Sequence, residues 1–285
     1  SHVGYTSILM KDKTRQTITF AAVGDIGIDH FISSGNKLPG GMALNSAFHA
    51  QKAGALASVV SALGDDADGA FIRRFVMENG IKATALEMIQ GPTNKVEITL
   101  DSAARPVYGT WDLGVLAEYR LTSFQKKYLQ SQDIVITVHL PELRGMFDDV
   151  AGCTLPNTLK VGDFTDLSEY HGDIGVLSQY SGAFDVYVVS IDEDISARRA
   201  KLKSFVKKEK VMGIALLGAE GSYVFFHGRE YYHKADHVSV VDTTGAGDTY
   251  LAYFLTSYLT EKDIARAMDI ATSEAARTIG HVGAI

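Results

Sequence analysis

The amino-acid sequence predicts an α/β fold with a mostly parallel central sheet covered by helices. Strand-like and helix-like segments alternate along the chain, and this alternation is typical of parallel sheets. Between Lys82 and Tyr108, three short strand-like runs instead follow one another, which predicts a small β insertion. Because 285 residues can bury one large core, we expect a single domain over residues 1–285.

The individual elements are predicted from apolar spacing and from the turn residues between them. The first strand alternates Ile18, Phe20 and Ala22 on one side and ends at Gly24-Asp25. Strands are expected at Ile18–Val23, Ala57–Ala62, Asp133–His139, Thr158–Asp163, Ala183–Ser190 and Val211–Leu217. Helices are expected at Met42–Ala53, Asp68–Asn79, Thr122–Gln130 and Ala197–Glu209, from about Gly245 onward, and at Glu261–Ile279.

The stretch DTTGAGDTYLAYF, Asp242 to Phe254, carries the most specific chemical pattern. Gly245 and Gly247 lack a Cβ, so an anion such as phosphate can approach the backbone closely. The helix start that follows offers free N–H groups and a positive dipole end. Asp248 beside this cradle is placed to take a proton from a hydroxyl that attacks phosphorus. The pattern therefore predicts phosphoryl transfer to an alcohol.

A plainer interpretation of the same stretch stays open on local chemistry alone. It is a strand-to-helix loop in which Thr244 is the N-cap and Asp248 complements the helix dipole. The earlier segment GDIGID does not offer a dinucleotide site instead, because its glycines depart from the G-x-G-x-x-G spacing and no helix is expected to start there.

Composition argues against some classes of partner. The net charge of −7 disfavours nucleic acid and a membrane surface as partners. No apolar run reaches 18 residues, so no membrane span is expected. The only cysteine, Cys153, rules out an intrachain disulfide and suits a reducing environment, and we therefore expect a cytoplasmic location.

The longer pattern, from about Ile18 to Ile285, resembles that of the ribokinase-like, PfkB-type carbohydrate kinases. In that family the aspartate of G-A-G-D is the catalytic base and the preceding amides form the anion hole. The resemblance implies these roles for Asp248 and for Gly245, Ala246 and Gly247. It also implies a ribokinase-like three-layer sandwich with a small β-sheet lid, and an ATP-dependent sugar kinase that uses Mg²⁺.

The segment LPGGMALNSAFHAQKAG resembles the family's first signature, in which a Gly-Gly turn and a following asparagine contact the sugar. The resemblance implies that Gly40, Gly41 and Asn45 bind the substrate. Asp25 closes the first strand at the edge where open α/β sheets bind ligands, so it is predicted to hold acceptor hydroxyls with Asn45.

The lid is expected from segments at about 31–41 and 82–110. The second contains the strand-like runs KATALEMI, NKVEITLD and RPVYGT. Because the lids of this family often pair between subunits, the resemblance also implies a homodimer formed through the lid.

The residues expected to bind the nucleotide match the family pattern less fully than those expected to bind the sugar. Gly218 and Gly221 stand where the family has an L-G-x-x-G turn that lines the ATP site, and Gly247 is expected to face the phosphates. Leu216 occupies the place of the family's usual threonine, so a hydroxyl that could reach a phosphate is missing.

Two cation sites are implied by the resemblance. The run Ser190–Glu193 keeps the glutamate of a metal-linked Asn-x-x-Glu motif but not its asparagine, and Glu193 is expected to orient Mg²⁺ through water. A solvated acidic helix start is the alternative for Asp192. Asp242 and the carbonyl of Thr244 lie where many members bind a monovalent cation such as K⁺.

The acceptor is suggested by a narrower resemblance. YGTWDLGVLAEYRLT and VGDFTDLSEY resemble the fructoselysine 6-kinases, a subgroup of the family that phosphorylates a fructose-amine at its 6-hydroxyl. Asp163 takes the place where many members have D-x-N-x-R, but this chain lacks that asparagine and arginine. Arg105, on the expected lid turn, either grips a substrate carboxylate with its planar fork or is solvated.

Two alternatives to this function stay open. One is a kinase of a free ketose, a pentose or a nucleoside. The other is a catalytically silent sugar- or nucleotide-binding protein with the same fold, which the altered positions at Ser190–Glu193 and Leu216 leave open.

Overall fold

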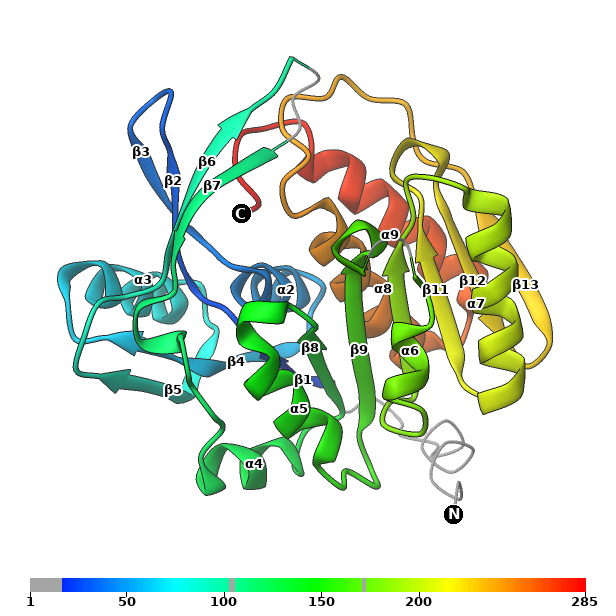
Figure 1. Cartoon of the computed structure of the whole chain (residues 1–285), viewed down its shortest axis with the longest axis horizontal. Helices are drawn as coiled ribbons and strands as arrows, with labels where there is room; N and C mark the ends of the chain where they lie inside the picture. The colour runs from blue at the N-terminus through cyan, green and yellow to red at the C-terminus, as the bar shows by residue number, and fades with distance from the viewer. Residues whose placement is uncertain (1–16, 103–105, 171–172) are drawn as a thin grey trace.

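A nine-stranded sheet forms the centre of the computed structural model, which describes residues 17–102, 106–170 and 173–285 (Figure 1). Its strands pair in parallel from β5 to β11, and only β12 runs antiparallel to its neighbours, β11 and β13. In spatial order they are β13 (Arg229–His233), β12 (Ser222–Phe226), β11 (Met212–Leu216), β10 (Val186–Ser190), β9 (Leu159–Asp166), β8 (Ile134–Val138), β1 (Thr19–Val23), β4 (Leu56–Gly64) and β5 (Lys82–Ile89).

Helices cover both faces of this sheet and make the three-layer sandwich that the sequence predicts. One face carries α2 (Met42–Lys52), α3 (Ala67–Glu78), α8 (Ala246–Glu261) and α9 (Ile264–Thr278). The other face carries α4 (Ser123–Leu129), α5 (Arg144–Gly152), α6 (Val176–Gln179) and α7 (Ile195–Glu209).

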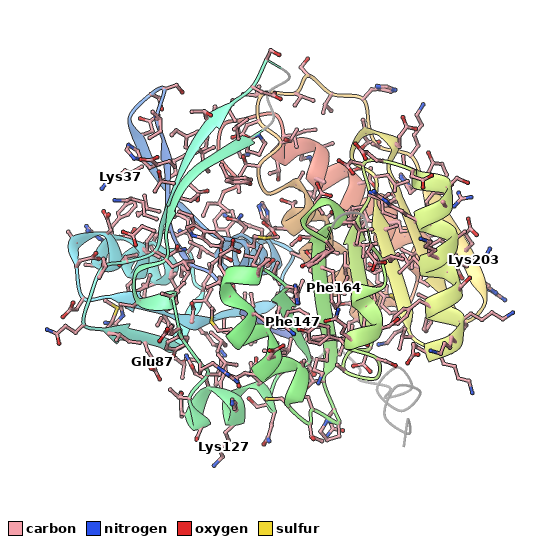
Figure 2. All side chains as sticks on the ribbon, viewed as in Figure 1. Lys37, Glu87, Lys127, Phe147, Phe164 and Lys203 are labelled. Carbon is pink, nitrogen blue, oxygen red and sulfur yellow. The ribbon has the colours of Figure 1, made fainter. Side chains whose placement is uncertain are left out.

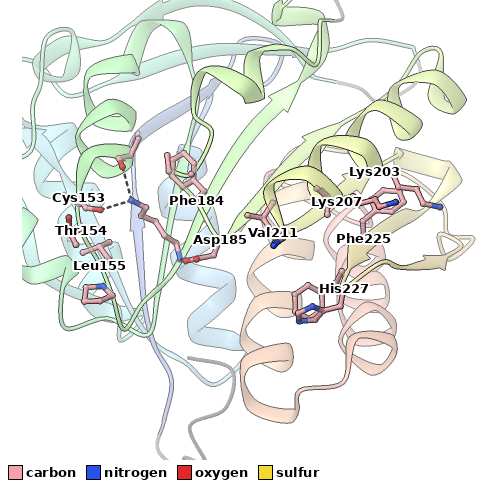
Figure 3. Close-up of a pocket in the computed structure, with 18 of the residues that line it drawn as sticks. Cys153, Thr154, Leu155, Phe184, Asp185, Lys203, Lys207, Val211, Phe225 and His227 are labelled. Atoms are coloured by element: carbon pink, nitrogen blue, oxygen red, sulfur yellow. Dashed lines mark hydrogen bonds between the residues drawn. The ribbon is translucent and has the colours of Figure 1, made fainter. Parts of the chain in front are cut away.

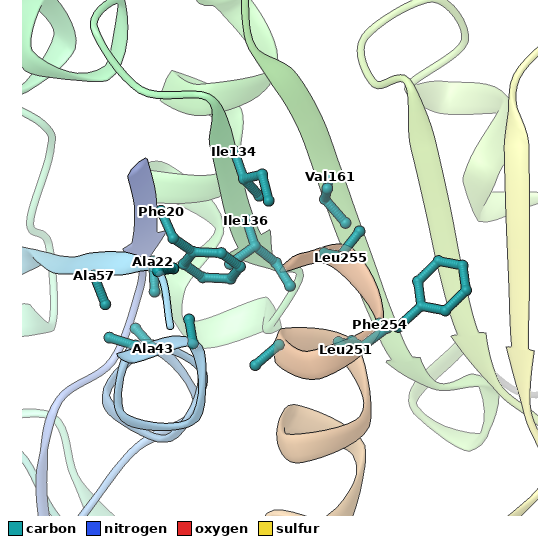
Figure 4. Close-up of a cluster of buried hydrophobic side chains, with 14 of the residues drawn as sticks. Phe20, Ala22, Ala43, Ala57, Ile134, Ile136, Val161, Leu251, Phe254 and Leu255 are labelled. Atoms are coloured by element: carbon teal, nitrogen blue, oxygen red, sulfur yellow. The ribbon is translucent and has the colours of Figure 1, made fainter. Parts of the chain in front are cut away.

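Each face of the sheet has its own apolar core. On the first face, Phe20 and Ala22 of β1 belong to the same buried cluster as Leu251 and Leu255 of α8 (Figure 4). On the second, Phe147 of α5 and the residue Phe164 of β9 are fully buried, with ring centroids 5.3 Å apart (Figure 2). This division follows from strand geometry, because successive side chains point to opposite faces and must be apolar on both.

A second, four-stranded sheet in the described part of the chain arches over one end of the sandwich (Figure 1). We call it the lid. Its spatial order is β3 (Asn36–Gly40), β2 (Gly27–Phe31), β6 (Lys95–Leu100) and β7 (Pro106–Asp112). The lid is tied to the sandwich at Thr93, whose N–H and hydroxyl donate to the carboxylate of Asp66, the N-cap residue of α3.

The predicted lid boundaries need one correction. Residues 82–110 were expected to belong to the lid, but 82–89 form β5, which pairs in parallel with β4 at the edge of the large sheet. The physical reason is that β4, α3 and β5 make one β-α-β crossover, which returns β5 beside β4. The helices α5 and α6 were not predicted, and both are short.

Candidate active site

Asp248 lies in the first turn of α8 and is buried beneath the lid end of the sheet. Its Oδ2 accepts a hydrogen bond of 2.9 Å from Nδ2 of Asn45, which lies on α2. The other oxygen, Oδ1, is buried and has no hydrogen-bond partner among the described residues, and the same is true of Oδ1 of Asn45. Buried polar atoms are nearly always paired, so these two oxygens are candidates for contact with a ligand.

Four carboxylates gather at this end of the sheet: Asp25, Asp29, Asp163 and Asp248. We call them the acidic cluster. Burial raises the pKa of Asp25 and of Asp163 to about 6. Burial, with the negative charges of Asp25 and Asp242, raises the pKa of Asp29 to about 7. Burial also raises the pKa of Asp248 well above its ordinary value, and the charges of the other three members add to this effect.

Two buried carboxylates, Asp25 and Asp29, lie where the sequence predicts one, Asp25, to hold acceptor hydroxyls. Oδ1 of Asp25 accepts the N–H of Met42 at 3.1 Å, so part of this carboxylate supports the start of α2. The carboxylate of Asp29, on β2 of the lid, accepts no hydrogen bond within the described part of the chain, and the residue is 5% exposed. The sequence reasoning missed it, although it stands four residues after Asp25 in an apolar strand, where an unpaired acid is unusual.

The two glycines of the first signature make room for these acids. A Cβ on Gly40 would lie 2.1–2.2 Å from the carboxylate atoms of Asp29. Gly41 has φ +99°, and a Cβ there would lie 2.6 Å from the carbonyl oxygen of Asp25. Both positions therefore require glycine, and the structure brings them beside Asn45 as the sequence predicts.

Asp163 ends the regular part of β9 and is held in a local turn. Its Oδ1 accepts the N–H of Thr165 at 2.8 Å. Thr165 has φ +52°, which is costly for a β-branched residue. Such strain occurs where the surrounding structure fixes a side chain in place, and here that side chain is the carboxylate of Asp163.

The loop before α8 offers an anion site of the predicted type. Gly245 is the N-cap residue with φ +75°, and no side chain caps the helix. Thr244 is therefore not the N-cap, and its hydroxyl and N–H donate instead to Oδ1 of Asp242. The N–H of Ala246 donates a weak hydrogen bond of 3.3 Å to the carbonyl of Thr243. It is therefore less available to an anion than the predicted anion hole requires.

Asp242 is fully buried, and its carboxylate holds this loop through hydrogen bonds. Besides the bonds to Thr244, its Oδ2 accepts the N–H of Gly283 at 2.8 Å. The neighbouring Ala284 packs against Gly245, where a Cβ would lie 2.3 Å from the Cβ of Ala284. The C-terminal turn thus fixes the backbone that precedes Asp248.

The nucleotide and metal residues are less enclosed. Gly218 has φ +54° and open space around its Cα, whereas a Cβ on Gly221 would lie 2.1 Å from the carbonyl oxygen of His233. Glu193 is exposed beside Asp192, which pairs with Arg198 at 3.6 Å. No group of three or more metal-ligating side chains occurs in the described residues.

Two further features define the limits of the site. Arg105, a predicted substrate contact, lies outside the described residues. A pocket of about 910 Å³ lies elsewhere, where the chain enters β9 and leaves α7, and it contains none of the acidic cluster (Figure 3).

No helix in the described part of the chain is long and apolar enough to cross a membrane.

The fold and the buried acid at a helix start define a kinase of the ribokinase-like class. Residues 19–142 and 185–285 match the pfkB family of carbohydrate kinases, and the chain belongs to this family. It is therefore a sugar phosphotransferase, and the sequence-based prediction of this class is confirmed.

Similar proteins agree with this assignment. Fructoselysine 6-kinase from Shigella flexneri is 26% identical over 93% of this chain and 99% of its own. Fructosamine kinase FrlD from Bacillus subtilis is 24% identical over 92% of this chain and 91% of its own. The structure of Arabidopsis thaliana ribokinase with ribose and ATP has a TM-score of 0.76 at 20% identity, covering 94% of each chain. The last likeness concerns the fold alone.

Proposed function

We propose that this protein transfers the γ-phosphate of ATP to a primary hydroxyl of a sugar, and that its acceptor is a fructose-amine such as fructoselysine, phosphorylated at the 6-hydroxyl. The observation that carries the reaction is the free Oδ1 of Asp248, buried at the uncapped start of α8. It leaves one carboxylate oxygen for a hydroxyl proton and a set of helix N–H groups for the phosphoryl group.

In the proposed mechanism, Asp248 accepts the proton of the attacking hydroxyl while the N–H groups of Gly245, Ala246 and Gly247 face the phosphoryl oxygens, and Ala246 gives up its weak bond to the carbonyl of Thr243 for this contact. The bond to Asn45 holds the carboxylate in one orientation. Mg²⁺, when bound with ATP, would neutralise phosphate charge, and Glu193 is the proposed contact to it through water. Gly218 and Gly221 are the proposed ATP-side turn. Positioning carries most of the catalysis in such transfers.

The acceptor is proposed to lie between the lid and α2, held by Asp25, Asp29 and Asn45, with Gly40 and Gly41 allowing its close approach. Asp163 and Arg105 complete the proposed set. The acidic cluster supports an amine-bearing acceptor, because none of the described groups that shift the pKa of its members is a cation. A positive charge on the acceptor would supply the missing counter-charge.

The assembly around this reaction is also part of the proposal. A homodimer would form through the lid, and the protein would work in the cytoplasm. Asp242 and Thr244 are the proposed monovalent-cation site, although the chain itself already donates hydrogen bonds to both oxygens of Asp242.

The test is ADP release from Mg-ATP across a panel of acceptors, with fructoselysine, fructose, ribose and adenosine as members. We expect the highest kcat/KM with fructoselysine and a fall in turnover of about 10²- to 10⁴-fold in Asp248→Asn. Turnover on a plain sugar or nucleoside alone would keep the kinase and discard the fructose-amine. Binding of ATP and sugar with no ADP from any acceptor would favour the silent binding protein.

A further inference from the structure

Tyr108 projects from the face of the lid that looks toward the acidic cluster. On β7 it pairs with Ile98 of β6, which in turn pairs with Phe31 of β2. Paired residues of neighbouring strands share a face, and so do alternate residues of one strand. Asp29, two residues before Phe31, therefore lies on the same face as Tyr108. Val107 lies on the opposite, outer face.

The surroundings of the Tyr108 hydroxyl agree with this direction. The enclosing protein raises the pKa of Tyr108 far above its ordinary value, and the charges of Asp29 and Asp248, followed by Asp25 and Asp242, add to the effect. These charges act on the hydroxyl, which agrees with the side of the lid that the strand pairing gives for Tyr108. The side chain is nevertheless 61% exposed, because it stands in the open space between the lid and the sandwich.

Tyr108 is much more exposed than the residues beside it on the same face of the lid. The neighbours that share its face, Phe31 and Ile98, are 2% and 1% exposed. The strand that carries Tyr108 is anchored independently, because Nε1 of Trp111 donates a bond of 2.6 Å to Oδ1 of Asn94. The ring is thus carried by a fixed strand, and most of it is open to solvent.

Carboxylates below and an aromatic ring above form a suitable enclosure for a cation. The face of a tyrosine ring attracts an ammonium group within about 6 Å of its centroid. The acidic cluster supplies the opposite charge from the other side. A neutral sugar would gain from the hydrogen-bonding carboxylates but much less from the ring.

We propose that Tyr108 is a specificity-determining residue, whose ring covers the positively charged, amine-bearing part of the acceptor and selects it over the neutral sugar. The inference rests on the proposed function, since it requires an acceptor that binds beneath the lid and carries an amine.

The test compares fructoselysine with fructose in the wild type and in three variants. Tyr108→Leu removes the ring, Tyr108→Phe removes only the hydroxyl, and Val107→Ala changes the neighbouring residue on the outer face, which is 50% exposed. The readouts are kcat and KM for both acceptors, and the Kd of each acceptor by calorimetry without ATP. All three substitutions are at exposed positions, so the fold should persist.

We expect Tyr108→Leu to raise KM and Kd for fructoselysine by about 3- to 30-fold, the range of a cation–π contact, with a smaller change for fructose. The ratio of kcat/KM between the two acceptors should therefore fall. Tyr108→Phe and Val107→Ala should keep that ratio, because the ring face or the whole ring remains.

An unchanged ratio and an unchanged Kd for fructoselysine in Tyr108→Leu would overturn the role of Tyr108, even if the wild type phosphorylates fructoselysine well. Wild-type protein that does not bind fructoselysine would also overturn it. In that case turnover on fructose or ribose would show that the kinase reaction survives and that only the amine is wrong. An equal loss for both acceptors would make Tyr108 a general lid contact and not a selector.

Discussion

The acidic cluster and the pocket of Figure 3 lie in different parts of the molecule, and their buried polar groups differ in one respect. In the pocket, Lys160 is 8% exposed, and its Nζ donates to the carbonyl oxygens of Val150, Ala151 and Cys153 at 3.2, 2.9 and 2.8 Å. Every donor that the ammonium group has is used. In the acidic cluster, Oδ1 of Asp248 is buried and unused.

The difference is that the acidic cluster, although it is not the pocket, contains a buried carboxylate oxygen that the described chain leaves without a hydrogen bond. The pocket is large, but its buried lysine ties the end of α5 to β9 and is internally satisfied. The acidic cluster holds charge that the described chain does not neutralise. The hydrogen bonds of Lys160 stabilise the fold. The acidic cluster destabilises it, as groups kept for binding often do.

The largest effect is expected from Asp248→Asn. If Asp248 is the base, turnover should fall by about 10²- to 10⁴-fold, since an amide cannot accept the hydroxyl proton. The free energy of unfolding should stay equal or rise, because a buried charge is removed without a change of shape. Steady-state kinetics and urea denaturation measure the two quantities. Turnover at the wild-type rate would contradict the assignment.

Gly40→Ala tests the proposed acceptor site without replacing a charged residue. The added Cβ would lie within about 2.2 Å of the carboxylate of Asp29 and must displace it. We expect KM for the acceptor to rise by about 10- to 100-fold, as displaced contacts do in such sites. Gly152→Ala, where nothing lies within 4 Å of the new Cβ, is the matched control. Equal kinetics in the two variants would remove Asp29 from the acceptor site.

Lys160→Met tests whether the buried lysine of the pocket in Figure 3 stabilises the fold. Three carbonyl groups lose the lysine as a donor, and that of Val150 keeps the N–H of Cys153, so the free energy of unfolding should fall by about 1–3 kcal/mol. The kcat/KM for ATP and sugar should not change. Lys207→Met, at an exposed lysine of the same pocket, should leave stability nearly unaltered. A kinetic defect in Lys160→Met with normal stability would show that the pocket has a functional role.

The smallest effect concerns pH. Asp29 has a folded pKa of about 7, against an ordinary value of 3.8, so the folded chain holds this proton where the unfolded chain releases it. Its contribution to stability is therefore present below pH 4 and is lost as the pH rises toward 7. Asp29→Asn should gain about 1–2 kcal/mol relative to wild type between pH 5 and pH 8. Denaturation curves at both values measure it, and a constant difference would mean that Asp29 is paired.

Most of the fold was predictable from the sequence, because it depends on patterns repeated in many residues. The strand around Phe20 and the helix after Gly247 each carry several apolar residues at regular spacing, and both were placed correctly. The place of β5 was not predictable in this way. Whether a strand joins one sheet or another depends on which partner edge lies nearby, and local periodicity does not contain that information.

The candidate site shows the same division. Gly40, Gly41, Asn45 and Asp248 come together in the structure, and their motifs could be seen in the sequence. Asp29 was missed because a single carboxylate in a strand has no signature until the strand is known to face a cleft. The burial that raises its pKa is a property of the folded chain alone.

The hydrogen bond between Asn45 and Asp248 joins residues that are 203 positions apart in the chain. Contacts over such distances form slowly, because the intervening chain must lose its freedom before the contact contributes anything. During refolding, the local β-α units should therefore appear well before this bond. Recovery of enzymatic turnover would lag behind recovery of helical circular dichroism, which makes activity a strict reporter of complete folding for this kinase.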